Sequence, residues 1–132
     1  MKYMLDTNMC IYAIKQKPKQ VMLKLQEHDP EDICISAVTY AELVCGVEKS
    51  AVVDKNRLAL AMLLANIEIC DFDVDAADCY GSIRADLEKN GTPIGPLDTM
   101  IAGHAASLNC TLVTNNEREF SRVKCLKIEN WA

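Results

Sequence analysis

Three acidic residues lie where a carboxylate is costly unless it has a function: Asp6, Glu42 and Asp98. Asp6 directly follows the short apolar run 3–5, and Asp98 stands two residues after Pro96, at the start of a predicted helix. Glu42 lies in the mostly apolar segment 36–47, which is typical of a buried helix, with no basic residue within helical reach. Carboxylates gathered without matched cations repel one another, and a divalent cation relieves this repulsion. We therefore interpret the three residues as a candidate metal site.

The donor atoms of this set predict the metal and its chemistry. Oxygen ligands favour Mg²⁺, or Mn²⁺ as a substitute, over Zn²⁺, and the seven cysteines form no C-x-x-C pair that would indicate zinc. Bound Mg²⁺ serves phosphoryl hydrolysis, in which one ion activates a water and a second stabilises the leaving oxygen. The polar segment 114–120, which follows another apolar run, offers a fourth ligand. The sequence thus predicts a metal-dependent nuclease.

Each candidate also has an ordinary structural interpretation. Asp6 begins the series Asp-Thr-Asn, and all three residue types cap helices. Asp98 could stabilise the dipole of its own helix, and Glu42 could be solvated at the edge of its helix. His104 lies in line with the apolar face of a predicted helix, so we interpret it as a packed histidine rather than a general base.

The elements that must position these residues alternate between strands and helices. Short apolar runs predict strands at 3–5, 33–35, 67–70, 111–113 and 126–128. A period of 3.6 residues predicts helices at about 8–16, 18–28, 37–49, 52–65, 74–90 and 97–109, with boundary signals at Pro18, Ser36, Gly91 and Pro96. This alternation predicts an α/β fold with a central, mostly parallel sheet of about five short strands flanked by helices. In such sheets ligands bind beyond the carboxyl ends of the strands, where Asp6 and the segment 114–120 fall.

Length and composition predict one folded domain spanning residues 1–132. Half of the residues are apolar and a quarter are charged, which excludes a disordered chain. No apolar stretch approaches the ~20 residues that span a membrane, and Asp6 interrupts any amino-terminal signal sequence, so we expect a cytoplasmic protein. Most cysteines lie in apolar runs and are expected to be buried. The net charge of -5 is unusual for a nucleic-acid-binding protein, but metal ions at the gathered carboxylates would set the local field.

Four segments together resemble the PIN-domain family, and particularly the VapC ribonuclease toxins of bacterial toxin-antitoxin modules. They are residues 3–8, 36–43, 91–98 and 113–120, so the resemblance runs almost from end to end. It implies a PIN-like α/β/α sandwich and an acidic core of Asp6, Glu42 and Asp98, with Asp6 and Asp98 as the principal Mg²⁺ ligands. It also implies a set of supporting polar residues, namely Thr7, Asn8, Thr114 and Asn116.

The fourth acidic position departs from the pattern of that family. Many members have an acidic residue after the fourth strand, whereas this chain has Asn115 and Asn116, with Glu119 the nearest carboxylate. We expect Glu119 to be the fourth catalytic residue, and Asn116 is the other option for a ligand. The number of metal ions, one or two, stays open.

The same resemblance implies a substrate and partners. The substrate is structured RNA, most often transfer RNA, which is cut in an exposed single-stranded loop so that translation is inhibited. The expected partners are a cognate VapB-like antitoxin and a second copy of the chain, in a homodimer that joins larger toxin-antitoxin complexes. Seven basic residues are expected to contact RNA phosphates: Lys15, Lys17, Lys19, Arg118, Arg122, Lys124 and Lys127.

Two other function classes stay open on the sequence. A phospho-receiver domain also places aspartates and Mg²⁺ at strand ends, but it would leave Glu42 without a role. A non-catalytic partner-binding module would use the carboxylates as surface caps, and its signature would be the absence of metal-dependent cleavage.

Overall fold

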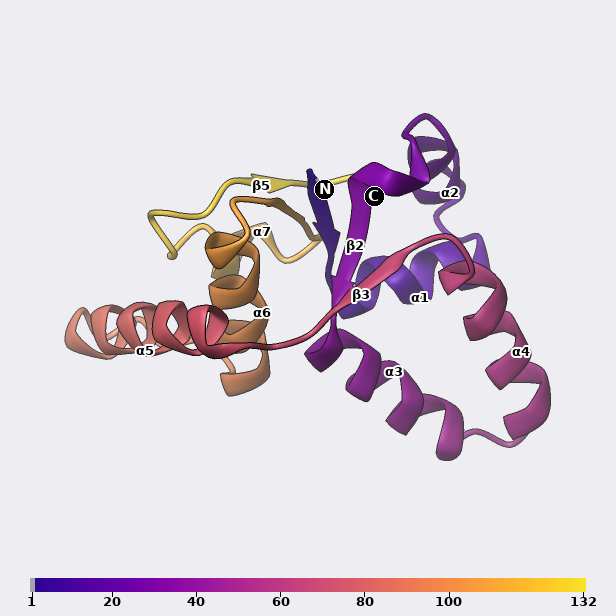
Figure 1. Ribbon diagram of the computed structural model, residues 1–132, viewed down its shortest axis with the longest axis horizontal. Helices are drawn as coiled ribbons and strands as arrows, with labels where there is room; N and C mark the ends of the chain where they lie inside the picture. The colour runs from indigo at the N-terminus through magenta and orange to yellow at the C-terminus, as the bar shows by residue number, and fades with distance from the viewer. Residues whose placement is uncertain (1) are drawn as a thin grey trace.

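The computed structural model describes residues 2–132, whose centre is a sheet of five parallel strands (Figure 1). The strands are β1 (Tyr3–Leu5), β2 (Ile33–Ser36), β3 (Glu68–Cys70), β4 (Thr111–Val113) and β5 (Ile128–Glu129). Their order in the sheet is β3-β2-β1-β4-β5, and every neighbouring pair is parallel. The predicted α/β class with a central parallel sheet is confirmed.

The central strands are buried on both faces because successive side chains point into two different cores. Met4 pairs in register with Cys34 on one side and with Leu112 on the other, and all three belong to one core. The next residue along β1, Leu5, pairs with Val113, and both belong to the second core. This alternation fixes the register of β1 between its neighbours.

Seven α-helices cover the sheet within the described residues: α1 (Thr7–Lys15), α2 (Lys19–Gln26), α3 (Ala37–Glu48), α4 (Val53–Leu64), α5 (Val74–Lys89), α6 (Pro96–Ser107) and α7 (Glu117–Phe120). Helices α5 and α6 supply buried residues to one core, whereas α1, α2, α3 and α4 supply the other. Figure 1 shows the first pair on the left of the sheet and α3 and α4 on the right. The expected α/β/α sandwich is therefore confirmed.

The predicted boundary signals act as expected. The Ser36 hydroxyl accepts a hydrogen bond from the Val38 N–H at 3.0 Å and caps α3. Pro96 is the first residue of α6, after Gly95 at the cap position. Gly91 follows α5 with a φ of +68°, a left-handed conformation that favours glycine.

The structure differs from the sequence predictions at four elements. Strand β5 begins at Ile128, two residues later than predicted, and the short helix α7 and a 3-10 turn at Pro30–Asp32 were not predicted. Helix α3 is not buried all round, because only Thr39, Leu43 and Val47 are fully buried. The small residues between them, such as Ala41 and Cys45, are exposed, and small side chains leave little apolar surface in water.

The cysteines mostly behave as buried apolar residues. Cys10, Cys34, Cys70 and Cys110 are buried, as predicted, whereas Cys45 and Cys125 are exposed and Cys79 is partly exposed. Within residues 2–132, no helix has both the length and the apolar character needed to cross a membrane.

Candidate active site at the carboxyl edge of the sheet

The strand order creates a topological switch point between β1 and β4. From β1 the chain proceeds to β2 and β3 on one side, and it returns to β4 on the other side of β1. Ligand sites of open parallel sheets form at such points, beyond the carboxyl ends of the strands. Asp6 directly follows β1 and Thr114 directly follows β4, and the Asp6 N–H donates to the Val113 carbonyl at 3.0 Å. The sheet therefore positions two of the predicted site residues side by side.

Asp6 is both a helix cap and a buried carboxylate. Its Oδ1 accepts a hydrogen bond from the Met9 N–H at 2.9 Å, which caps α1, and the residue is only 4% exposed. Burial raises the pKa of Asp6 above its ordinary value, the bonds from Thr114 and Met9 oppose this shift, and the charge of Glu42 adds to it. The capping interpretation and the site interpretation thus apply to the same side chain.

Glu42 reaches the same region from α3. The Ser36 cap starts that helix, so Glu42 lies almost two turns along it, partly buried. The Thr7 hydroxyl of α1 donates to Glu42 Oε1 at 2.6 Å across the gap between the two helices. This bond fixes one carboxylate oxygen of Glu42 next to the residue that follows Asp6.

Asp98 stands in the first turn of α6 and is partly buried. Burial is the largest cause that raises the pKa of Asp98 to about 6, and the charges of Glu42, Asp6 and Glu119 follow as further causes. Glu42, Asp6 and Glu119 therefore lie within electrostatic range of Asp98, although the four carboxylates come from four different parts of the chain.

Asn116 holds Glu119 in place. The Asn116 side chain caps α7 by accepting from the Glu119 N–H at 3.4 Å, and its Nδ2 donates to Glu119 Oε2 at 2.7 Å. The Asn116 N–H in turn donates to the Thr114 hydroxyl at 2.9 Å. Asn116 thus positions a carboxylate, and Glu119 supplies the fourth acidic group. The spacing of Asn116 and Glu119 is that of a capping box, a signal that would have predicted α7.

The cluster has no matching cation in the described part of the chain. None of the ion pairs found among residues 2–132 includes Asp6, Glu42, Asp98 or Glu119. In their present positions, no three acidic, histidine or cysteine side chains of these residues stand close enough to hold a metal ion. The oxygen donors fit a hard divalent cation in chemical type, and their mutual repulsion favours its binding.

Asn8 and His104, two further polar residues considered for the site, differ in their burial. Asn8 is exposed on α1, whereas His104 is 1% exposed inside α6. His104 Nδ1 lies 2.7 Å from the Ser36 hydroxyl, and its ring packs edge-on against Phe72 with centroids 5.4 Å apart. Burial lowers the pKa of His104, and nearby Asp73 and Asp71 oppose this. The prediction of a packed histidine is confirmed.

An apolar cavity of about 270 Å³ adjoins the cluster between α1, α3 and α4. Glu42 and Lys15 are its charged lining residues, and most of the remaining lining is aliphatic, including Ile11, Leu43 and Leu60. One carboxylate of the candidate site, that of Glu42, therefore lies in the wall of a mostly apolar cavity.

Comparison with known proteins agrees with this geometry. The sequence pattern of the PIN domain matches residues 3–125. The chain is 44% identical over 131 residues to the tRNA(fMet)-specific endonuclease VapC of Salmonella typhimurium, which covers 99% of this chain and 98% of that protein. It is 45% identical over 132 residues to the protein of the same name from Shigella flexneri, with coverage of 100% and 99%.

Solved structures show the same similarity in three dimensions. DNA-bound VapBC from Salmonella typhimurium superimposes with a TM-score of 0.95 at 43% identity, covering 100% of this chain and 99% of the other. VapBC2 from Rickettsia felis, bound to a DNA fragment from its promoter, superimposes with a TM-score of 0.92 at 41% identity, covering all of both chains.

Proposed function

The chain belongs to the PIN-domain family and is a VapC-type endoribonuclease, and we propose that it cuts RNA with Mg²⁺ held by Asp6, Glu42 and Asp98. The observation that supports this metal set most strongly is the cluster itself. Burial, and then the charges of three neighbouring carboxylates, raise the pKa of Asp98, and no ion pair among residues 2–132 relieves the repulsion among these carboxylates. The phospho-receiver interpretation is not retained, because the PIN-domain match covers residues 3–125.

The chain's own side chains prepare this site in three ways. The Met9 N–H orients Asp6, the Thr7 hydroxyl orients Glu42, and Asn116 orients Glu119. A bound Mg²⁺ supplies a water of lowered pKa and neutralises charge at the phosphate, and Mn²⁺ can substitute for it. Glu119 keeps Oε1 outside its bond to Asn116, and we assign it as the fourth acidic group, next to Asp98.

Transfer RNA is the proposed substrate. Two relatives that match nearly the whole chain are named tRNA(fMet)-specific endonucleases, so tRNA(fMet) is the first RNA to test. Cutting it would inhibit translation, which is the expected effect of a toxin. A protein that acts on this substrate works in the cytoplasm, and we place the chain there.

A VapB-like antitoxin is the proposed partner, in assemblies that also pair two copies of this chain. The similar solved structures are VapBC complexes. The apolar cavity beside Glu42 supports the proposal, because an apolar antitoxin segment that fills it would bring a neighbouring basic side chain to the acidic site. Such a segment would block the site by charge as well as by bulk.

Cleavage of tRNA(fMet) by the purified chain tests the proposed function. Reactions contain Mg²⁺, Mn²⁺ or EDTA, and the cut ends are mapped by sequencing. We expect metal-dependent cuts that disappear in Asp6→Asn and Asp98→Asn and persist in Asp78→Asn, which removes an exposed carboxylate of α5. Cuts that survive in Asp98→Asn would refute the assigned site. No cutting of this tRNA or of total RNA with either metal would favour a non-catalytic binding module.

A further inference from the structure

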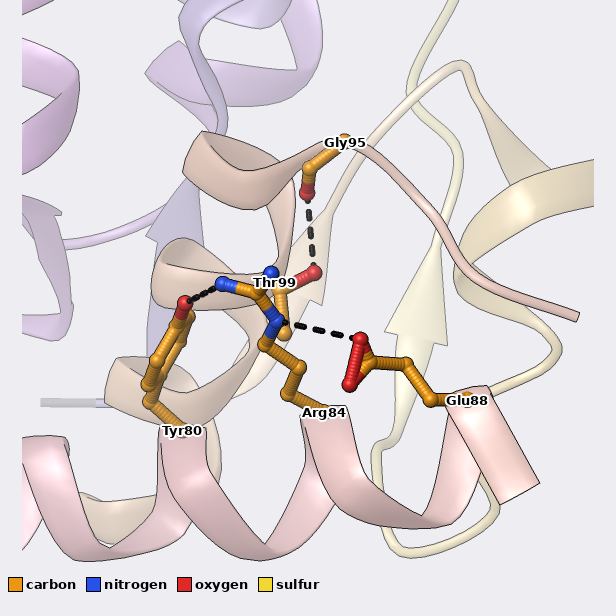
Figure 2. A network of polar contacts seen from close by, with 5 residues as sticks. All are labelled: Tyr80, Arg84, Glu88, Gly95 and Thr99. Atoms are coloured by element: carbon orange, nitrogen blue, oxygen red, sulfur yellow. Dashed lines mark hydrogen bonds and ion pairs between the residues drawn. The ribbon is translucent and has the colours of Figure 1, made fainter.

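A small hollow lies between α5 and the first turn of α6, the turn that also carries Asp98. It has a volume of about 100 Å³, and its lining includes Arg84, Glu88, Pro93, Pro96 and Thr99. Figure 2 shows Arg84 reaching from α5 toward Thr99, between Tyr80 and Glu88. Arg84 is the one basic residue that lines this hollow, and it is absent from the basic residues that sequence reasoning selected for phosphate contacts.

Arg84 is held in place by its own helix. Its Nη1 donates to the Tyr80 hydroxyl at 2.5 Å, and its Nε donates to Glu88 Oε2 at 3.5 Å. The guanidinium carbon also lies 5.9 Å from the centre of the Tyr80 ring. These contacts occupy two of the five N–H donors of a guanidinium, so three are left for a ligand. The side chain is therefore oriented before any ligand arrives, which lowers the entropic cost of binding.

The walls of the hollow are also fixed. The Thr99 hydroxyl donates to the Gly95 carbonyl at 2.8 Å, as Figure 2 shows, and Arg122 Nη1 donates to the Pro93 carbonyl at 3.0 Å. Further along the two helices, a Cβ on Gly103 would stand 2.7 Å from the Tyr80 backbone nitrogen. Only glycine allows this approach, and it brings α5 close enough to α6 for Arg84 to line the same hollow as Thr99.

The hollow and the acidic cluster share the first turn of α6. Thr99 lines the hollow, and the residue before it, Asp98, belongs to the cluster. The neighbours that act on Asp98 are the acidic residues Glu42, Asp6 and Glu119, and no cationic side chain is among them. Arg84 lines this hollow and is not paired with any of the four carboxylates, so it remains available to a negatively charged substrate.

Arg84 and Glu88 form an exposed ion pair four residues apart on α5, which leaves the guanidinium able to take a ligand. The pair of Arg84 and Glu88 is at the limit of hydrogen-bond distance, and its side chains are 51% and 55% exposed, so it contributes little to stability. Arg57, paired with Glu48 at 3.9 Å, is similarly exposed at 50%. Arg57 lines none of the cavities described above, so it serves as a matched control for Arg84.

We propose that this hollow binds a phosphate of the RNA strand next to the one that is cut, and that Arg84 contacts its oxygens. The proposal rests on the proposed ribonuclease function and adds a substrate-binding residue to it. A guanidinium forms two parallel hydrogen bonds to a phosphate, which lysine cannot reproduce. Arg84 would set the path of the strand from α5 to the carboxylates.

Binding and cleavage of tRNA(fMet) by Arg84→Ala, Arg84→Lys and Arg57→Ala test the proposal. Binding of the fluorescently labelled transcript is measured by anisotropy in an Asp98→Asn background, so that no RNA is cut, across a series of salt concentrations. For Arg84→Ala we expect Kd and KM to rise about tenfold. The slope of log Kd against the logarithm of the salt concentration should fall by about 0.7, which corresponds to one lost phosphate contact. We expect kcat to change less than about twofold, because Arg84 does not contact the reacting atoms.

The controls separate the possible outcomes. Arg84→Lys should restore the salt slope but only part of the affinity, because it keeps the charge and loses the paired geometry. Arg57→Ala should bind and cut like the parent chain. An Arg84→Ala variant with the parent's Kd, KM and salt slope would overturn the phosphate site while leaving the ribonuclease function intact. A parent chain that neither binds nor cuts RNA would overturn both.

Discussion

Replacing Asp98 with asparagine should stabilise the metal-free chain at neutral pH, although it should abolish cleavage. Burial, together with the charges of Glu42, Asp6 and Glu119, raises the pKa of Asp98 from 3.8 to about 6. The folded chain therefore holds this proton more tightly than the unfolded chain. The resulting stabilisation is complete below pH 3.8 and is lost as the pH rises to about 6. Above that range, the ionised Asp98 lowers the free energy of unfolding, and asparagine, which carries no charge, removes this destabilisation.

The size of the effect follows from the two pKa values. The difference between 3.8 and about 6 corresponds to about 3 kcal/mol in the free energy of unfolding. Asp98 is partly exposed, and solvent screening reduces the expected gain to about 1–2 kcal/mol. For a domain of this size the gain corresponds to a rise in Tm of about 3–8 °C.

Urea unfolding in EDTA from pH 4 to pH 8 measures this gain, with the fluorescence of the single, buried Trp131 as the probe. The Asp98→Asn variant and the parent should be equally stable near pH 4 and should separate as the pH rises to about 7. The exposed Asp78→Asn substitution serves as the control and should show no such separation. Adding Mg²⁺ should then stabilise the parent more than Asp98→Asn, because the ion binds the folded parent.

Two results would refute this reasoning. If Asp98→Asn were less stable than the parent at pH 8, Asp98 would make a stabilising interaction that outweighs its repulsion. If the two chains differed by a constant amount from pH 4 to pH 8, the pKa of Asp98 would not be raised in the folded state.

Three further predictions concern the packing of α6 and the orientation of the carboxylates. Gly103→Ala should lower the free energy of unfolding in urea by about 1–3 kcal/mol, because the added Cβ meets the α5 backbone. Gly46→Ala, with open space around it, should raise that free energy by up to about 1 kcal/mol. Equal stabilities of the two variants would contradict the described contact between α5 and α6. Thr7→Val removes the hydrogen-bond donor to Glu42 and should lower kcat about tenfold with little change in stability. An unchanged kcat would show that Thr7 does not support the site. Glu119→Gln should lower the pKa that governs the acidic limb of the pH–rate profile, since one source of repulsion is lost; an unshifted profile would contradict its place in the cluster.

The sheet could be predicted from sequence because its inner strands are short apolar runs, which are typical of strands buried on both faces. Met4 and Leu5 face opposite cores, and Leu112 and Val113 repeat this pattern. The end of the chain could not be predicted as well, because β5 has only two residues and a partly exposed pattern. Helix α3 misled the prediction for a related reason: apolar composition was taken as burial, but its small residues face solvent at low cost.

The candidate site could be predicted in its members but not in its arrangement. Asp6, Glu42 and Asp98 are far apart in the chain, and sequence spacing does not show that they lie within electrostatic range of one another. That proximity depends on the order of β1 and β4, which an alternation of strands and helices leaves undetermined. The roles of Asn116 and Glu119 stayed open in the sequence because both are good ligands. Their hydrogen bonds distinguish them, since Asn116 donates to Glu119 and caps α7 at the same time.

The net charge of -5 gains a physical explanation from this arrangement. Four of the negative charges stand together at one edge of the sheet, where one or two divalent ions would offset much of the repulsion that they exert on RNA. A chain of this charge has little long-range attraction for RNA, so its affinity must come from a few fixed contacts near the site. Arg84 lines a hollow together with Pro93 and Pro96, Arg122 donates to the Pro93 carbonyl, and each arginine is already hydrogen-bonded in place. The salt dependence of RNA binding should therefore be shallow and should depend on metal, and a steep slope in EDTA would contradict this account.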